Sequence, residues 1–450
     1  MPDFRVAPFF ALPLAALLAG CSLGSTIDST LGLGGDSGAV SSQSTGLAVG
    51  DEPFAVKTGT AILAQGGSAA DAVTAMFFAM SATYPVAVGL GGGGICLISD
   101  PVKGVREFDF LPRAANGGGS YAVPGAVRGF YDLQSAFGTL PWQRTVSGGE
   151  AYAASGFPIS HALWTRLGNA QNGVRLDASL AAEFMNENGT PRPEGAIATN
   201  LALSQTLATI RLSGADGFYK GAVADELVRY SASQSGAIST ADLADYRSTI
   251  TAPRLTNQGG YSVALPNAAT GAGQFAQSLF TNAARSADAE ASVVLAVRQS
   301  LTSFGVSTLP SDLGGTGFAA IDRNGQVATC AMTMNGAFGA GHTAGKTGVL
   351  LANSPSAPAG IAGAFLTPLI ARDGNGRAVL TGVGAGGPNG TAAIAYAFLK
   401  LAGGQQIGRP ADLRSTGAAP MVTVNVISCQ TVCVALPDPG GHGLGAATSE

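Results

Sequence analysis

Apolar positions follow a helical period over much of the chain before residue 315 and change to short strand-like runs after it. Between residues 57 and 83 the helical pattern is interrupted at Gly66-Gly67. We therefore expect one helix that ends at Leu63 and a second that spans Ala69 to Ser81, with Ser68 as its N-cap. Nearly every face of the second helix is apolar, which predicts that this helix is buried.

A glycine-rich run, residues 89–94, precedes an expected strand at Ile95–Ser99, whose hairpin partner lies near Arg106–Leu111. The apolar pattern predicts further helices at Gly125–Ala136, Gly148–Ala154, Ala178–Asn186, Asn200–Leu212, Val223–Ser233 and Thr391–Leu401. Turn residues separate short strands at Phe318–Asp322, Val327–Met334, Ile370–Ala371 and Ala378–Thr381. These elements indicate a mixed domain in which helices cover β-sheet.

Composition narrows the class of protein. Hydrophobic residues make up 46% of the 450 residues and charged residues only 12%, so intrinsic disorder is excluded for most of the chain. The net charge is −4, and Lys and Arg do not cluster anywhere. We therefore expect no nucleic-acid partner.

The N-terminus has the features of an export signal. Its apolar stretch, Val6–Gly20, is too short to span a membrane, and Leu18-Ala19-Gly20-Cys21 resembles a bacterial lipoprotein signal box. We expect residues 1–20 to be a signal peptide, Cys21 to carry lipid, and residues 21–50 to form a flexible Gly/Ser-rich tether. The alternative is an ordinary signal peptide with a chance cysteine. The lipoprotein interpretation predicts a bacterial envelope protein that faces the periplasm and is held to a membrane by its lipid.

Export places the remaining cysteines in an oxidising compartment. Cys429 and Cys433 are expected to form a disulfide, provided that the three residues between them turn back. Cys96 and Cys330 lie in apolar, strand-like runs, and we expect them to be buried, free thiols. The three histidines are scattered without metal-ligand spacing, so no metal site is predicted.

A series of short segments resembles, in order, the γ-glutamyltranspeptidase family of N-terminal nucleophile hydrolases. These segments are Ile62–Ala72, Gly89–Gly94, Val123–Gly129, Phe137–Trp142, Ala154–Phe157, Gly217–Gly221, Thr240–Arg247, Asp322–Gly325, Thr333–Gly339 and Gly345–Asn353. The resemblance implies an α+β fold, a four-layer αββα sandwich, formed by residues 51–450 as one integrated unit. It also implies a precursor that cuts itself into two subunits, with residues 51–315 as the large-subunit-like region and residues 316–450 as the small-subunit-like region.

The family's nucleophile is a threonine that self-cleavage leaves at a new N-terminus, where its own amine can act as the base. Where the family typically has Thr-Thr-His-aromatic, this chain has Gly315-Thr316-Gly317-Phe318. Without a gap, Gly315 falls on the nucleophile position. With a one-residue deletion Thr316 becomes the nucleophile and the cut falls between Gly315 and Thr316, but this register requires a β-bulge, which Gly317 could permit. Otherwise Thr316 is an ordinary hydroxyl at the start of a strand.

Other positions of the family's site are present. Thr333 and Asn335 match residues that contact the nucleophile and the substrate, and their spacing places both on one face of a strand. Gly386 and Gly387 match the glycine pair whose N–H groups form the oxyanion hole. A plain glycine turn is the alternative for this pair.

The positions that would recognise a γ-glutamyl group have changed. The family's arginine for the α-carboxylate falls on Leu111, and its acid for the α-amine falls on Ala357. Before that acid the family has an acid or an amide, whose position falls on Ser354. The family's pair of serines falls on Ala364 and Phe365. Arg113, two residues after Leu111, is a candidate substitute for the arginine, or else a surface residue.

The sequence therefore predicts a γ-glutamyltranspeptidase-like amidohydrolase or acyltransferase that uses Thr316 and needs no cofactor. Its substrate is expected to be a small-molecule amide or γ-glutamyl-like compound that differs from the family's substrate. The alternative is an inactive member of the family that acts as a binding or structural module of the envelope.

Overall fold

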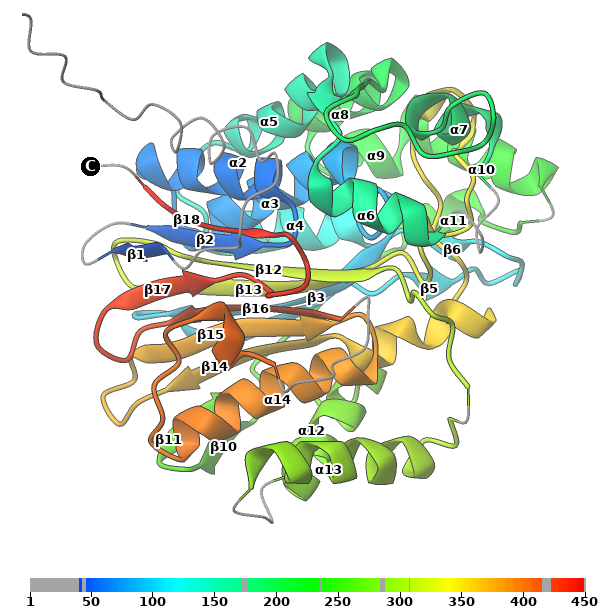
Figure 1. The fold of residues 1–450 in the computed structure, drawn as a ribbon. Coiled ribbons are helices and arrows are strands. Elements are labelled where there is room, and N and C mark those ends of the chain that lie inside the picture. The colour runs from blue at the N-terminus through cyan, green and yellow to red at the C-terminus, as the bar shows by residue number, and fades with distance from the viewer. Residues whose placement is uncertain are drawn as a thin grey trace, which may run out of the picture.

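The computed structural model describes residues 40–42, 46–170, 176–234, 236–283, 288–306, 308–414 and 422–448. Two seven-stranded antiparallel sheets lie face to face, and helices cover the outer face of each sheet (Figure 1). This is the four-layer αββα sandwich of the α+β class that the resemblance implies.

Sheet I has the strand order β18-β2-β12-β13-β3-β4-β9. Its strands are β2 (Leu47–Gly50), β3 (Gly93–Asp100), β4 (Gly104–Asp109), β9 (Thr249–Thr251), β12 (Gly315–Ile321), β13 (Val327–Thr333) and β18 (Leu444–Ala447). Strands β12 and β13 lie at its centre, so both faces of each are covered: all residues of β13 are buried, as are all of β12 except Ile321.

Sheet II has the strand order β1-β17-β16-β15-β14-β11-β10. Its strands are β1 (Val40–Ser42), β10 (Leu255–Gln258), β11 (Tyr261–Ala264), β14 (Thr367–Arg372), β15 (Ala378–Ala385), β16 (Thr423–Ser428) and β17 (Cys433–Leu436). It packs on sheet I mainly through β15 and β16, which lie against β12 and β13. Two small ribbons pair β5 (Arg113–Ala114) with β6 (Ala122–Val123) and β7 (Phe157–Pro158) with β8 (Ile197–Ala198).

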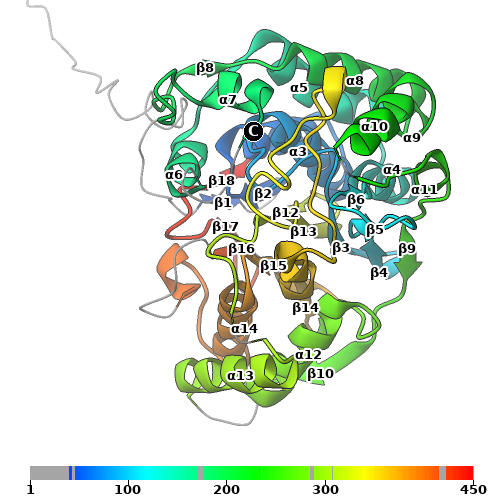
Figure 2. The same ribbon diagram turned by 90° about the vertical axis from the view of Figure 1, so that its right-hand side faces the viewer.

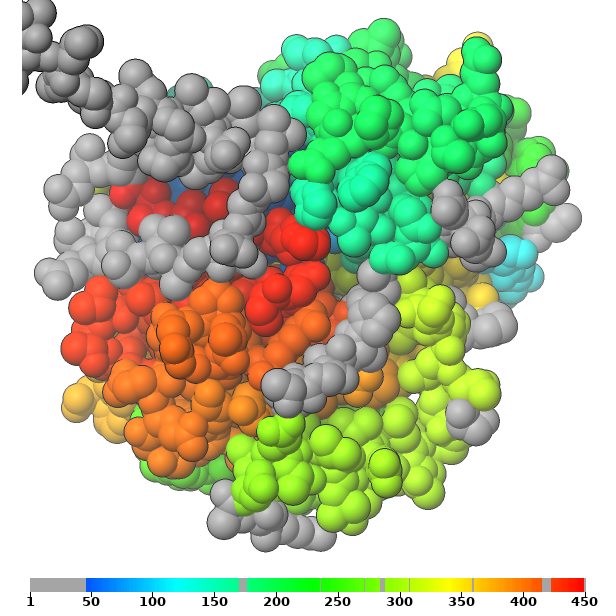
Figure 3. Space-filling model, viewed as in Figure 1, coloured from blue at the N-terminus to red at the C-terminus, as the bar shows by residue number. Residues whose placement is uncertain are grey.

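The helix layer on sheet I is the larger of the two (Figure 2). It contains α2 (Pro53–Ala64), α3 (Ala69–Thr83), α4 (Ala126–Phe137), α5 (Trp142–Ser155), α6 (His161–Ala170), α7 (Ala178–Phe184), α8 (Leu201–Ser213), α9 (Asp216–Tyr219), α10 (Gly221–Ser233) and α11 (Thr240–Ala244). The layer on sheet II contains α12 (Gly271–Ala283), α13 (Ala289–Ser303) and α14 (Pro388–Ala402). In Figure 3 the red and orange C-terminal segments occupy the left-hand part of the visible face, above the yellow-green segment at the bottom.

Helix α3 forms as the sequence predicts. Ser68 caps it in a reciprocal capping box with Asp71, and all of its residues are buried between sheet I and the outer helices. Asp71 also accepts hydrogen bonds from the backbone and hydroxyl of Thr139, so the buried carboxylate is fully satisfied. Among the described residues no helix combines the length and apolarity needed to cross a bilayer.

The structure moves one predicted boundary. Residues 40–42 and 47–50 were both expected to lie in the flexible tether. Residues 40–42 form strand β1, paired with β17, and residues 47–50 form the buried strand β2 between β12 and β18. The tether was predicted from the Gly/Ser-rich composition of residues 21–50 as a whole. A strand of four apolar residues changes that composition too little to be recognised. The predicted signal peptide, residues 1–20, and Cys21 lie outside the described residues.

The two disulfides differ from the prediction at one pair. Cys429 is bonded to Cys433, as expected, but Cys96 is bonded to Cys330 rather than free. These two residues lie directly opposite each other on β3 and β13, with their α-carbons 4.1 Å apart. Because 234 residues separate them in sequence, only the pairing of the two strands brings them together.

Candidate active site

The register of β12 against β13 shows whether the bulge expected for the one-residue deletion is present. Gly315 pairs with Thr333, and the β12–β13 ladder continues without a register shift to Ile321 and Val327. The β-bulge that the one-residue deletion would require is therefore not formed. Close packing against sheet II opposes such a bulge at Gly317. A β-carbon on Gly317 would meet the Val383 side chain of β15 at 2.4 Å, so β12 lies tightly against sheet II.

Position 315 faces the glycine loop of sheet II. A β-carbon on Gly315 would meet the Gly386 nitrogen at 3.0 Å, with the next atoms at 3.5 and 3.6 Å. A side chain here would fit after a small adjustment. The preceding residue is different, because Gly314 has a φ of +61° and a β-carbon there would lie 1.9 Å from the Gly336 carbonyl. Position 315 thus accepts a β-carbon once the Gly386 backbone gives by a few tenths of an ångström, whereas position 314 does not.

Gly386 and Gly387 join the end of β15 to the start of α14, and both have positive φ, +83° and +114°. Neither N–H group donates to an acceptor among the described residues. The positive end of the α14 dipole adds to the field of these two donors. The arrangement suits a carbonyl oxygen or a carboxylate, as expected of an oxyanion hole.

Thr333 and Asn335 are buried and contact each other. The Asn335 N–H donates to the Thr333 hydroxyl at 2.9 Å, and the Asn335 side chain donates to the Asn353 carbonyl at 2.8 Å. Asn353 returns a hydrogen bond to the Asn335 carbonyl at 2.8 Å, which holds Asn335 in a left-handed conformation with φ of +53°. Thr333 therefore lies opposite Gly315 with its hydroxyl already oriented.

Thr316 points elsewhere, because neighbouring side chains on a strand alternate between its faces. Its hydroxyl donates to Asp51 at 2.5 Å, and the same carboxylate accepts from Thr423 at 2.5 Å and from Asn425 at 2.8 Å. Thr316 and Asp51 are both buried. Asp51 was not predicted from the sequence, although an acidic pair, Asp51-Glu52, between two apolar segments is an unusual pattern.

A second residue missed from the sequence contacts the same strand end. Arg166 of α6 donates from Nη1 to the carbonyl of Gly315 at 3.1 Å and pairs through Nη2 with Asp312 at 2.5 Å. Both side chains of this ion pair are buried. The carbonyl of the Gly315–Thr316 peptide therefore faces a cation, while the Thr316 hydroxyl faces a carboxylate.

The predicted substrate residues do not form a charged pocket. Leu111 packs in an apolar cluster between the sheets with Val383 and Ala385. Arg113 is exposed and stacks on the Tyr246 ring, with its guanidinium carbon 4.6 Å from the ring centre. Ser354 is buried, and its hydroxyl accepts from the N–H of residue 356 within its own turn. The other three positions lie at or in a short 3₁₀ helix, Pro358–Phe365, with Ala357 as its N-cap and with Ala364 and a fully buried Phe365 inside it.

Two facing sheets between helix layers, with a glycine loop opposite the start of a central strand, define an N-terminal nucleophile hydrolase fold. The Gamma-glutamyltranspeptidase family profile matches residues 55–285, about half of the chain. The chain belongs to the γ-glutamyltranspeptidase family, which is a family of hydrolases and transferases. The matched residues end before β12, so they do not include Gly315, Thr316 or the glycine loop.

Relatives known by sequence include the Glutathione hydrolase proenzyme of Pseudomonas sp. (strain A14), 32% identical over 243 residues, and Glutathione hydrolase 2 of Arabidopsis thaliana, 32% identical over 219 residues. These matches cover 48% and 45% of this chain but only 42% and 38% of the relatives. Among solved structures, the cephalosporin acylase of Bacillus halodurans aligns with a TM-score of 0.73 and 16% identity, covering 92% of this chain and 97% of that one. The γ-glutamyltranspeptidase of Helicobacter pylori aligns with a TM-score of 0.53 and 24% identity, covering 59% of this chain and 85% of that one. Both likenesses concern the fold.

Proposed function

We propose that this protein is a member of the family that does not cleave amides and instead binds an amide-containing small molecule in the bacterial envelope. The observation that carries the proposal is Gly315, the residue that faces Gly386 and pairs with Thr333. Glycine offers no hydroxyl to attack a carbonyl, so the usual covalent chemistry has no starting atom at this position.

The rest of the site supports ligand binding. The N–H groups of Gly386 and Gly387, which donate to no described residue, lie at the start of α14 and favour a carbonyl or carboxylate oxygen. Leu111 packs among apolar side chains where the family has an arginine, so the α-carboxylate of a γ-glutamyl group would lack its cation. The ligand is therefore expected to have an amide or carboxylate and an apolar neighbouring group rather than a free α-amino acid end.

A second candidate function is favoured by a different observation. The Thr316 hydroxyl donates to the Asp51 carboxylate, and Arg166 donates to the carbonyl of Gly315. A hydroxyl beside a proton acceptor and a carbonyl beside a cation are the two requirements for attack of Thr316 on the preceding peptide bond. The attack would transfer the Gly315 acyl group from the Thr316 nitrogen to its hydroxyl oxygen, and the hydroxyl proton, taken up by Asp51, would pass to the leaving amine. Water would then hydrolyse the ester between Gly315 and Thr316 and leave the N-terminal threonine that a γ-glutamyltranspeptidase-like hydrolase or acyltransferase needs.

Intact mass and N-terminal sequencing of the purified chain under reducing conditions separate the two functions. Reduction is essential because the Cys96–Cys330 disulfide would join the two fragments of a chain cut at residue 315. A single uncut chain supports the binding module. A fragment that begins Thr-Gly-Phe supports the hydrolase and overturns our first proposal.

We also propose that the protein is anchored in the envelope through lipid on Cys21, facing the periplasm. The support is the signal-box sequence Leu18-Ala19-Gly20-Cys21, together with two disulfides in the folded chain, which fit an oxidising compartment. Fractionation of cells that express the full chain tests this proposal, and it fails if the protein is found only in the soluble fraction.

A further inference from the structure

A cleft of about 780 Å³ lies at the end of the sandwich away from Gly386. Four hairpin ends form it, two from each sheet: the β3–β4, β12–β13, β14–β15 and β16–β17 connections. Strand β15 begins in this cleft at Ala378 and ends beside Gly386 at Ala385. At about 3.4 Å per residue the two sites are roughly 24 Å apart, so the cleft is separate from the candidate active site.

Arg372, at the end of β14, lines the cleft. Its side chain has no ion pair and no hydrogen bond to any described residue, and its Nε is buried without a partner. The register of β14 against β15 shifts between Ala371 and Arg372, leaving Val379 as an extra residue. Such a bulge changes the direction in which the adjacent side chain points. The chain thus holds an uncompensated, partly buried cation in the wall of a cavity, which is costly unless a ligand pairs with it.

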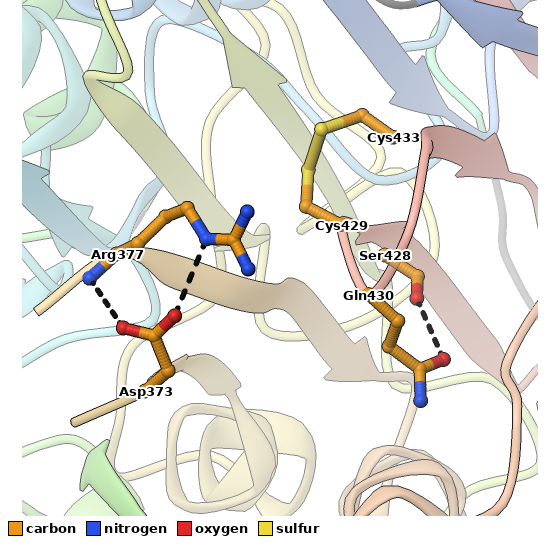
Figure 4. The surroundings of a disulfide bond; sticks show 6 residues. All are labelled: Asp373, Arg377, Ser428, Cys429, Gln430 and Cys433. Atoms are coloured by element: carbon orange, nitrogen blue, oxygen red, sulfur yellow. Dashed lines mark hydrogen bonds and ion pairs between the residues drawn. A yellow bond between two sulfur atoms is a disulfide. The ribbon is translucent and has the colours of Figure 1, made fainter. Parts of the chain in front are cut away.

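A second cation, Arg377, lies on the same hairpin (Figure 4). Its Nε donates to Asp373 at 3.3 Å, and no described residue uses its two outer nitrogens. The carboxylate in the lining, Asp100, accepts from the Val102 and Lys103 N–H groups and from Gln326. Because the hydrogen bonds of Asp100 are satisfied within the protein, the groups left for a ligand are mainly donors.

We propose that this cleft binds a small organic molecule that carries an oxyanion group, a carboxylate or a phosphate, through Arg372 and Arg377. The planar guanidinium group matches either oxyanion with two parallel hydrogen bonds. A cavity of about 780 Å³ is larger than a bare ion needs and falls in the range of small-molecule sites. The exposed amides of Asn324 and Asn375 lie in the same lining and supply further polar contacts.

The Cys429–Cys433 disulfide fixes one wall of the cleft. Both cysteines line it, and the Cys429 N–H donates to the carbonyl of Val379, the extra residue of the bulge. Gln430, between the cysteines, accepts from the Ile407 N–H at 2.7 Å. The loop that the disulfide closes is therefore tied directly to the bulge beside Arg372, and an open disulfide should weaken binding.

Isothermal titration of the full chain with citrate and with glycerol 3-phosphate tests the proposal, with inorganic phosphate as a third probe. We expect citrate or glycerol 3-phosphate to bind with a dissociation constant below the millimolar range. Citrate binding would assign a carboxylate ligand, and glycerol 3-phosphate binding a phosphate ester. Saturation by inorganic phosphate alone, or by none of the three, would overturn the proposal for an organic ligand.

Substitutions of single arginines test whether the ligand binds in this cleft. Arg372→Gln should weaken it by about tenfold or more and Arg377→Gln by less, because Arg377 keeps part of its hydrogen-bonding capacity for Asp373. Arg254→Gln removes an exposed arginine that does not line the cleft and should leave binding unchanged. Equal effects of all three variants would show that net charge alone is responsible, which contradicts the proposal. Urea unfolding of each variant identifies any loss that comes from misfolding, and the Cys429→Ala/Cys433→Ala pair provides an independent second measurement at the same wall.

Discussion

The Gly386 nitrogen lies 3.0 Å from the place that a β-carbon on Gly315 would occupy, so the oxyanion glycine faces a residue without a side chain. The N–H groups of Gly386 and Gly387 donate to no described residue, while position 315, which pairs with Thr333, carries no hydroxyl. The Gly386 N–H could therefore bind a carbonyl oxygen, whereas residue 315 has no hydroxyl to attack the carbonyl carbon.

Gly315→Thr should give the chain the hydroxyl that this position lacks. We expect the variant to cut itself before the introduced threonine, because that hydroxyl would lie opposite Thr333 and beside Gly386. N-terminal sequencing under reducing conditions measures the cut. Gly315→Ala is the matched control, since it adds the same β-carbon without a hydroxyl and should stay uncut. If the Gly315→Thr variant folds but stays uncut, the site lacks a further feature needed for self-cleavage besides the threonine side chain.

Thr316→Val should destabilise the protein without changing its processing. Loss of the hydroxyl leaves Asp51 with one donor fewer, and hydrogen bonds to a charged group are worth about 1.5–3 kcal/mol. Thr329→Val on β13 is the control, because the Thr329 hydroxyl donates to the neutral Gly382 carbonyl, and it should cost about 1 kcal/mol. Urea unfolding compares the two variants. Conversion of a two-chain parent into an uncut Thr316→Val protein would favour the hydrolase instead.

The two disulfides should differ in their contribution to stability. The chain-entropy model gives about 5 kcal/mol for a loop of 234 residues and about 2 kcal/mol for one of four. Cys96→Ala/Cys330→Ala should therefore lower the free energy of unfolding more than Cys429→Ala/Cys433→Ala. Equilibrium unfolding in urea under non-reducing conditions measures both. Similar values for the two pairs would contradict this account.

Local signals in the sequence predicted much of the secondary structure. The α3 cap at Ser68 and the β14–β15 turn depend on residues close in sequence, so the sequence carried enough information to predict them. Helices α12 and α13 were not predicted, and Asp51 was missed because its partner Thr316 is 265 residues away.

The register of β12 was the open question for the site. Gly315 and Thr316 are adjacent, so the sequence allowed either to occupy the nucleophile position. Tertiary packing sets the register of the strand: Gly315 pairs with Thr333, and a β-carbon on Gly317 would meet the Val383 side chain at 2.4 Å. A one-residue shift would turn every side chain of β12 to the opposite face, and no local pattern carries that information.

Cys21→Ser should release the protein from the membrane fraction of cells that express the full chain. The signal box Leu18-Ala19-Gly20-Cys21 predicts that this cysteine carries the lipid, and serine cannot form the thioether. Fractionation followed by immunoblotting measures the distribution. Cys429→Ser, which leaves the signal box intact, is the control and should remain membrane-bound. Equal retention of both variants would refute lipid anchoring at Cys21.

The raised pKa of Glu52 predicts how the free energy of unfolding depends on pH. It is buried at the start of α2, where its carboxylate accepts from the Ala55 N–H at 2.7 Å and the Thr83 hydroxyl at 2.9 Å. Burial raises the pKa of Glu52 from 4.5 to about 7, and these hydrogen bonds only partly oppose it. Between the two values the folded chain keeps a proton that the unfolded chain releases. The free energy of unfolding should therefore fall as pH rises from about 4.5 to about 7.

Glu52→Gln tests this assignment, because glutamine stays neutral throughout the range. A pKa shift from 4.5 to about 7 corresponds to roughly 3 kcal/mol of unfolding free energy. The decrease in unfolding free energy with rising pH should therefore be smaller by about this amount in Glu52→Gln than in the parent. Urea unfolding at about pH 5 and about pH 8 measures the fall. Glu187→Gln, at an exposed position, should leave the parent's fall unchanged. Burial also raises the pKa of Glu107 to about 7 and that of Glu183 to about 8, so part of the dependence should remain in Glu52→Gln. A fall as large in Glu52→Gln as in the parent would mean that Glu52 is already ionised in the folded protein at pH 5.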